Sequence, residues 1–246
     1  MSAIQEHWDA QAAKGDQAGT RDRLASQLEA REISKWVEPT DTVLDFGCGL
    51  GDTLASLRPE TRRQGRVGID FAAKMIRQAR KRHPNLTFIE GGLDQVALAG
   101  PFSIIYTQRC LINLPSIDEQ VSYINTLRES CDTLVCVECS QQGLARLNVV
   151  RCEWGLEKIV PPWHNLYLDE EIIRDETGDG LIMDAHDFSS TYYYVSRVIN
   201  AYQAQHEGRE PDYEAPINQK AAHEIMRCAP SGCGQVRLWV WAGTSQ

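Results

Sequence analysis

Three glycines alternate with other residues directly after an apolar run, in the segment 43–54 (VLDFGCGLGDTL). An apolar run followed by such glycines and a helix-compatible segment predicts a strand, a tight turn and a helix N-terminus. Glycine permits positive φ and lets the backbone touch a ligand, and the free N–H groups of the helix point to the same place. The segment therefore predicts a small-ligand site, with a purely structural loop as the alternative.

A second acidic residue follows at a suitable distance. Residues 66–70 (RVGID) are typical of a short strand that ends in a carboxylate, Asp70. In Rossmann-like folds, an acidic residue at the end of the second strand accepts hydrogen bonds from the ribose of a nucleotide. We expect this role for Asp70 and expect Phe71 to lie beside the adenine. The alternative is that Asp70 only caps the helix that follows.

The spacing of the glycines separates two kinds of nucleotide site. A dinucleotide fingerprint, G-x-G-x-x-G, that began at Gly47 would need a glycine at position 52, where this chain has Asp52. The pattern from Asp45 to Gly51 is instead D-x-G-x-G-x-G, which closely resembles the first motif of class I S-adenosylmethionine (SAM)-dependent methyltransferases. The motifs that carry this resemblance lie within residues 40–140. It implies SAM as the cofactor and S-adenosylhomocysteine (SAH) as the product.

The resemblance leaves one cofactor contact open. The family often carries an acidic residue directly after a glycine beyond the third strand, where this chain has Gly92 followed by Leu93 and Asp94. Either Asp94 or backbone groups would therefore read the adenine amino group. The complete set of expected cofactor contacts is Trp8, Arg21, Asp45, Gly47, Cys48, Gly49, Gly51, Asp70, Phe71, Leu93, Asp94, Gln108 and Arg109.

The N-terminal region has little periodicity. Residues 1–20 are expected to be a weakly ordered segment with one helical turn, and residues 21–37 a helix. In many methyltransferases the segment before the core folds over the cofactor, so Trp8 is a candidate to close the site, or else a surface anchor. Arg21 and Arg23 are candidates to meet the cofactor's carboxylate, and a solvated helix face is the alternative.

The remaining pattern predicts the elements that position these residues. Strand-like runs separated by helical periodicity predict an α/β fold, a doubly wound and mostly parallel seven-stranded Rossmann-like sheet. Strict alternation over residues 235–241 predicts a half-buried antiparallel last strand. Residues 140–167 lack a regular pattern, and long irregular stretches in compact domains are usually functional. We expect a helical substrate cap from residues 140–175 and 189–234.

Length and charge restrict the class of protein. The 246 residues are expected to form one domain, with an N-terminal segment and helix at 1–37, a cofactor-binding core at 38–140 and a last strand at 235–243. A net charge of −9 argues against nucleic acid as the main partner. No apolar run approaches the ~20 residues of a membrane span. We expect a cytoplasmic protein, and the sequence leaves its oligomeric state open.

Metal binding is not expected. Cys136 and Cys139 form a C-x-x-C pair, but they lie in an apolar strand-like run and no second pair completes a zinc set.

Candidates for contact with the methyl acceptor come from the end of the fourth strand and from the cap. They are Asn113, Arg151, Trp163, Tyr167 and Tyr192. His164 is the first choice of general base because imidazole titrates near neutrality, and Glu138 is the rival. A polar small molecule such as a sugar or specialised metabolite is the expected acceptor, through a hydroxyl or an amine.

Two other functions remain open. A nicotinamide-dependent oxidoreductase or epimerase would share the fold and Asp70, but the glycine spacing opposes it and no Y-x-x-x-K pair accompanies the turn. A non-catalytic SAM-binding protein would keep the cofactor motifs and lack a working acceptor site.

Overall fold

The core of the protein is one mixed β-sheet. The computed structural model describes residues 3–57, 65–223 and 231–244. Its strands are β1 (Val43–Phe46), β2 (Arg66–Asp70), β3 (Thr87–Glu90), β4 (Phe102–Gln108), β5 (Cys131–Cys139), β6 (Leu181–His186) and β7 (Val236–Ala242). They lie in the order β3-β2-β1-β4-β5-β7-β6, and β7 alone runs in the direction opposite to the other strands. The predicted mostly parallel, doubly wound sheet is confirmed.

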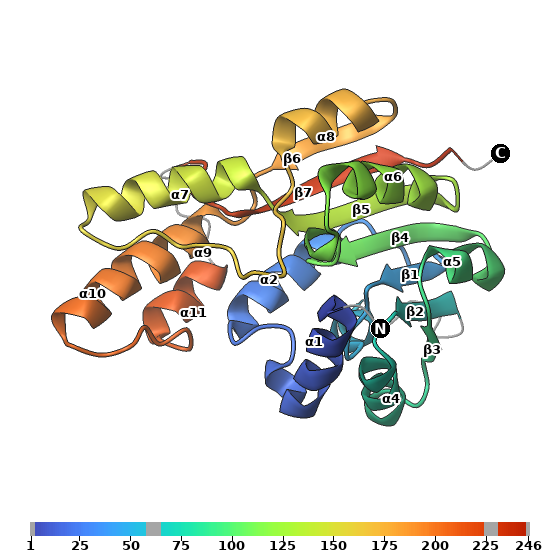
Figure 1. Cartoon of the computed structure of the whole chain (residues 1–246), viewed down its shortest axis with the longest axis horizontal. Helices are drawn as coiled ribbons and strands as arrows, with labels where there is room; N and C mark the ends of the chain where they lie inside the picture. The colour runs from blue at the N-terminus through green and yellow to red at the C-terminus, as the bar shows by residue number, and fades with distance from the viewer. Residues whose placement is uncertain (1–2, 58–64, 224–230, 245–246) are drawn as a thin grey trace.

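Helices cover both faces of this sheet. Figure 1 shows α6 (Ile117–Arg128) and α8 (Glu170–Thr177) on one side, and α2 (Arg23–Ser34) and α4 (Ala73–Arg82) on the other. The connections α3 (Asp52–Ser56) and α5 (Leu93–Ala99) complete the crossovers between parallel strands. Because the chain winds outward in both directions from β1 and β4, the carboxyl ends of these strands border a crevice, the usual ligand site in such sheets.

The N-terminal segment is more ordered than its sequence predicts. It forms helix α1 (Ala3–Gln11) and a 3₁₀ helix, η1 (Ala12–Gln17), in place of a single turn. The Asp9 carboxylate accepts a hydrogen bond from Lys74 N, 2.9 Å away, in the first turn of α4. This contact satisfies one of the free N–H groups of α4 and docks α1. The prediction of a weakly ordered segment was therefore wrong, because tertiary contacts supply the order.

A helix also replaces part of the predicted irregular stretch. Helix α7 (Gln141–Glu153) begins at Ser140, whose hydroxyl accepts a hydrogen bond from Gly143 N at 2.9 Å. Gly143 lowers the helix propensity of the sequence, but a Cβ there would lie 2.5 Å from Gly234 O. The glycine thus serves close packing against a distant segment, which the sequence alone does not reveal.

The second part of the cap is helical, as expected. Helix α9 (Ser190–Tyr194) continues through a π-helical turn, η4 (Val195–Ile199), into α10 (Asn200–His206), and α11 (Pro216–His223) follows. Figure 1 shows α7, α9, α10 and α11 together beyond the carboxyl ends of β4 and β5. Residues 224–230 of the expected cap lie outside the described part of the chain. No described helix is both long and apolar enough to span a membrane.

Strand β7 is antiparallel, as predicted, but it is not half-buried. It lies between β5 and β6, and Arg237, Trp239 and Trp241 on one face are all at most 1% exposed. The Trp241 indole donates to Thr177 O at 2.9 Å. Arg237 lies 2.6 Å from the Asp187 carboxylate and 3.3 Å from that of Glu170. The polar member of the alternating pattern is therefore paired inside the protein, not solvated.

This buried charge cluster gives a stability prediction. We expect Arg237→Leu to lower the free energy of unfolding by about 3–5 kcal/mol, because two carboxylates would lose their cation away from water. Arg174→Leu is the control, since Arg174 makes an exposed ion pair with Asp184 and exposed pairs contribute little. Urea denaturation would measure both variants. Equal losses would contradict a structural role for the buried cluster.

Candidate functional site

The glycine turn after β1 has one side facing open space. All three of its glycines have positive φ, at 82° for Gly47, 51° for Gly49 and 77° for Gly51. A Cβ on Gly47 would collide with Cys110 Sγ at 2.2 Å, and one on Gly51 with the Phe88 ring at 2.5 Å. At Gly49 a Cβ would meet no atom within 4 Å. Two of the glycines therefore serve packing, whereas Gly49 exposes its backbone to a cavity.

A buried carboxylate stands beside this turn. Asp70, at the end of β2, accepts hydrogen bonds from Gly49 N and Ala72 N, both at 2.8 Å. Burial raises the pKa of Asp70 to about 6, and these two backbone donors lower it. Each carboxylate oxygen keeps a second lone pair for a donor in the cavity. Burial likewise raises the pKa of Asp45 to about 7.

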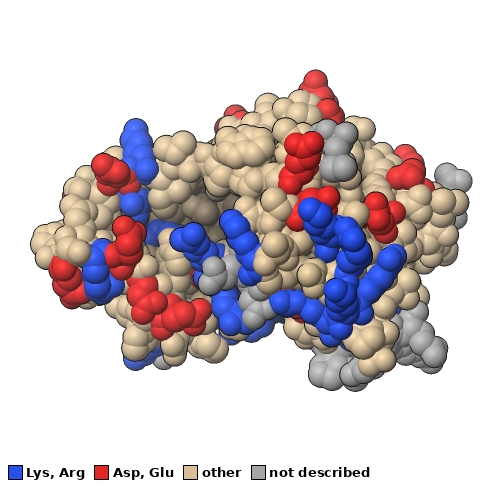
Figure 2. All heavy atoms as spheres, turned by 60° about the horizontal axis from the view of Figure 1, so that its bottom comes forward, with Lys and Arg blue, Asp and Glu red and all other residues tan. Residues whose placement is uncertain are grey.

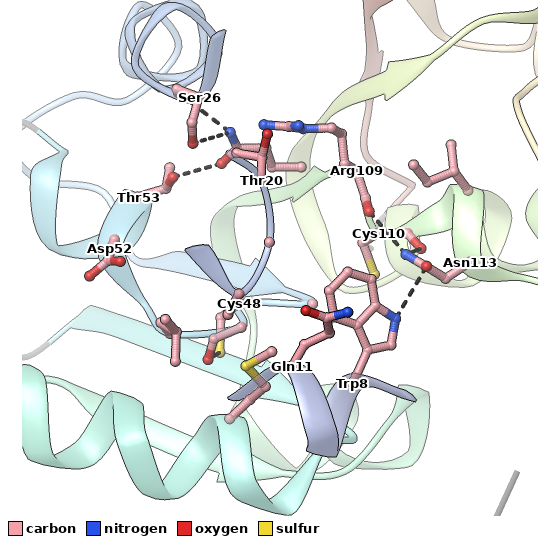
Figure 3. Close-up of a pocket in the computed structure, with 18 of the residues that line it drawn as sticks. Trp8, Gln11, Thr20, Ser26, Cys48, Asp52, Thr53, Arg109, Cys110 and Asn113 are labelled. Carbon is pink, nitrogen blue, oxygen red and sulfur yellow. Dashed lines mark hydrogen bonds between the residues drawn. The ribbon is translucent and has the colours of Figure 1, made fainter. Parts of the chain in front are cut away.

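The end of β4 is held by a buried glutamate from α2. Glu29 Oε2 accepts from Gln108 Nε2 at 2.7 Å and from Arg109 Nε at 3.0 Å. Gln108 also accepts from the hydroxyl of Thr53 at 2.6 Å (Figure 3). Arg109 has φ of 51°, a left-handed conformation that is uncommon for a residue with a side chain. Such strain persists only where surrounding contacts impose it, and these contacts do so at the cavity wall.

Helix α1 covers one side of the cavity. The Trp8 indole donates to Asn113 Oδ1 at 3.2 Å, and Asn113 in turn donates to the carbonyl oxygens of Arg109 and Cys110 (Figure 3). The rings of His7 and His164 lie 4.3 Å apart, centroid to centroid. These contacts join the N-terminal helix to the segment after β4 and to the loop before α8.

His164 is half-buried in this aromatic cluster. Burial and the neighbouring His7 both lower the pKa of His164, which favours the neutral imidazole. Its Nδ1 is buried and has no hydrogen-bond partner among the described residues. The residue as a whole lines the wall of the cavity described below.

These elements enclose one large cavity of about 1040 Å³, bounded by the glycine turn, the end of β4, α1 and the cap. Thirteen of the twenty predicted site residues line this cavity: Trp8, Arg21, Asp45, Gly47, Cys48, Gly49, Asp70, Phe71, Gln108, Arg109, Asn113, His164 and Tyr167. Among the described residues, no group of three or more His, Cys, Asp or Glu side chains is placed to hold a metal ion.

Several predicted residues lie elsewhere. Leu93 and Asp94 form the first turn of α5 outside the cavity lining, and the Asp94 carboxylate accepts from Gly92 N and Gln95 Nε2. Trp163 is 70% exposed and packs against the outer side of the histidine pair. Gly51 packs against the Phe88 ring and does not line the cavity. None of these residues is placed to contact a ligand in the cavity.

Three further candidates do not line the large cavity. Glu138 is fully buried, and its Oε1 accepts from Thr107 Oγ1 at 2.7 Å, Cys110 N at 3.0 Å and Leu111 N at 3.1 Å. It is therefore not placed to act as a base. Tyr192 points away from the cavity and donates to the Asp22 carboxylate at 2.5 Å. Arg151 lines a separate small cavity and does not reach the large one.

The sequence interpretation missed two prominent cavity residues. Tyr193 and Arg197 both line the large cavity. The Arg197 guanidinium lies 5.1 Å from the centre of the Tyr193 ring, and its Nη2 lies 2.5 Å from Asp22 Oδ2. Their spacing of four residues on a helix was the available signal, because such residues share one face.

Part of the chain is similar in sequence to known methyltransferases. Residues 43–133 match a family model described as a methyltransferase domain. A trans-aconitate 2-methyltransferase of Azoarcus sp. (strain BH72) is 33% identical over 98 residues, which are 40% of this chain and 38% of that protein. One from Afipia carboxidovorans is 40% identical over 75 residues, 30% and 25% of the two chains. The chain thus matches well under half of the length of these relatives.

Solved structures resemble the whole chain. Magnesium protoporphyrin IX methyltransferase from Synechocystis PCC 6803, with bound SAH, has a TM-score of 0.54 at 17% identity, covering 91% of this chain and 85% of that one. The N-methyltransferase NodS from Bradyrhizobium japonicum WM9, also with SAH, has a TM-score of 0.56 at 12% identity, covering 99% and 100%. The fold is that of the class I, Rossmann-like methyltransferases.

The Glu138 environment gives a pH prediction. Burial raises the pKa of Glu138 from 4.5 to about 7, against its hydrogen-bond donors, of which Thr107 has the largest effect. The folded protein then holds a proton that the unfolded chain has lost, so its stability falls as pH rises from 4.5 to 7 and levels off above. Glu138→Gln should remove this component, about 3 kcal/mol across the window. Urea unfolding at several pH values measures it, and parallel curves for both proteins would contradict it.

Proposed function

We propose that this protein is a SAM-dependent methyltransferase that acts on a polar small molecule. The observation that carries the proposal is the open backbone of Gly49 beside the Asp70 carboxylate, within a matched methyltransferase domain. A nucleoside needs both features, a backbone that it can approach and an acceptor for its ribose hydroxyls. The SAH complexes of the structural neighbours support the same cofactor here.

The residues present fit SAM. Asp70 would accept hydrogen bonds from the ribose, Phe71 would lie beside the adenine, and Gly49 leaves room for the chain of the cofactor. Arg21 is exposed at the mouth of the cavity, where it would meet a carboxylate. Trp8 would exclude water, since α1 holds it over the cavity through Asn113. When bound, SAM supplies an electrophilic methyl group on a sulfonium.

The acceptor side requires positioning more than acid catalysis. Holding a nucleophile in line with the methyl group contributes up to ~7–11 kcal/mol in well-oriented systems. A hydroxyl nucleophile also needs a base, and His164 is the group we assign, because burial favours its neutral form and the residue lines the cavity. An amine nucleophile would need only to be neutral, so the same site is compatible with N-methylation.

The cavity lining supports a polar acceptor, such as a sugar or another specialised metabolite, with polar groups from Asn113, Asn165 and Tyr167 on its acceptor side. The name trans-aconitate 2-methyltransferase specifies the acceptor of the relatives, whose matched segments cover at most 40% of this chain. The net charge of −9 supports a small molecule over nucleic acid, and a cytoplasmic site of action stays a prediction.

The cofactor assignment predicts selective binding. SAM and SAH should raise the melting temperature of the protein, and NAD should not. Asp70→Ala should weaken SAH binding by roughly 10- to 100-fold, because a charged acceptor contributes about 1.5–3 kcal/mol. Calorimetry at pH 8, above the pKa of Asp70 of about 6, would measure this. Asp118→Ala, on the exposed start of α6, is the control. NAD binding without any effect of SAM would overturn the assignment.

The base assignment predicts a loss of rate. His164→Ala should slow transfer to a hydroxyl acceptor by roughly 10²–10⁴-fold while leaving SAH affinity nearly unchanged, because a general base acts on the chemical step. Steady-state kinetics would separate a change in kcat from a change in KM. His206→Ala, an exposed histidine at the end of α10, is the matched control. A loss confined to acceptor KM would make His164 a binding residue and not a base.

A further inference from the structure

The lining of the large cavity is unevenly charged. Among the described residues, the only carboxylates that line it are Asp45, Asp52 and Asp70, all on the cofactor side. Its cations are Lys14, Arg21, Arg23, Arg82, Arg109 and Arg197. Figure 2 shows basic side chains gathered beside a hollow in this face. The protein as a whole has a net charge of −9, so this concentration of cations is local and not a reflection of composition.

Arg197 is the cation held deepest on the cap side. Its side chain is 13% exposed and is fixed between the Tyr213 ring, 4.3 Å from the guanidinium carbon, and the Tyr193 ring at 5.1 Å. Asp22, which pairs with it, does not line the cavity in the described part of the chain. The carboxylate therefore orients the guanidinium from behind. The side that faces the cavity presents a positive charge in a fixed orientation.

A second arginine lies next to it in a smaller cavity. Arg151 and Arg197 both line this space of about 170 Å³, and none of its described lining residues is acidic. Gln235 and Arg197 line both cavities and so stand where the two meet. The hydrogen bonds of Arg151 go to the carbonyl oxygens of Glu157 and Arg197. Burial and the nearby Arg197 lower the pKa of Arg151, as two like charges without an intervening anion would.

We propose that the methyl acceptor carries an anionic group, a carboxylate or a phosphate, that binds at Arg197 and Arg151 where the two cavities meet. This inference rests on the proposed methyltransferase function and narrows its acceptor class. Guanidinium groups match the planar or tetrahedral oxygens of these anions through paired hydrogen bonds. The anchor would hold the other end of the acceptor on the side of the large cavity lined by Tyr167 and His164.

The test uses the full chain saturated with SAH. Calorimetry at constant ionic strength compares inorganic phosphate and succinate with neutral succinamide. We expect either anion to bind and succinamide not to bind, and the stronger of the two identifies the anion class. Arg151→Gln and Arg197→Gln should each weaken anion binding by roughly 10-fold or more. Arg209→Gln is the control, because Arg209 makes an exposed pair with Glu207 beyond α10.

The two levels of proposal fail in different ways. If the wild-type protein does not bind SAH, the methyltransferase proposal is overturned. Normal SAH binding with succinamide as effective as succinate, or with anion binding unchanged in Arg151→Gln, would overturn the anionic acceptor alone. Among the described residues, the half-buried Arg151 is bonded only to carbonyl oxygens, so its variant remains informative even where Arg197→Gln fails to fold for want of the Asp22 pair. SAH affinity reports the folding of every variant.

Discussion

The buried carboxylate of Glu138 fixes the segment on which the cavity depends. It accepts hydrogen bonds from the side chain of Thr107 and from the backbone N–H groups of Cys110 and Leu111. These three donors join the turn after β4 to the end of β5, so the turn is held in one conformation. That conformation places Arg109 at positive φ and directs Asn113 toward Trp8. The closure of α1 over the cavity thus follows from a group inside the sheet.

Two other buried carboxylates hold side chains that line the cavity on the cap side. Glu29 holds Gln108 and Arg109, and Asp22 holds Arg197. Both come from α2 or its N-cap. Buried ion pairs add little net stability, because desolvation offsets their attraction. Their effect here is geometric: each guanidinium keeps one orientation before any ligand arrives. Preorganisation of this kind reduces the entropy that a ligand would otherwise lose on binding.

The sequence predicted best those features in which the backbone itself is the functional group. The glycine turn and the strand ending in Asp70 follow from local residue types, and the mostly parallel, doubly wound sheet follows from the alternation of strands and helices. The extents of helices α1 and α7 were not predicted, because neither has a strong apolar face. Their order comes from contacts such as Asp9 with Lys74 and from the close approach of Gly143 to Gly234. Such contacts join residues far apart in sequence, and the hydrophobic periodicity of a segment does not predict them.

Two predicted site residues, Glu138 and Tyr192, lie one position away from a residue that lines the cavity. Successive side chains on a strand point to opposite faces, so Cys139 lines the cavity while the adjacent Glu138 is turned away from it. Successive residues on a helix differ by about 100°, so Tyr193 faces the cavity while Tyr192 faces Asp22. Arg197 lies four residues after Tyr193 and therefore on the same face of the helix, so both side chains line the cavity. Chemical type identified the right elements, and only the packing of each element against the sheet decides which of its faces meets a ligand.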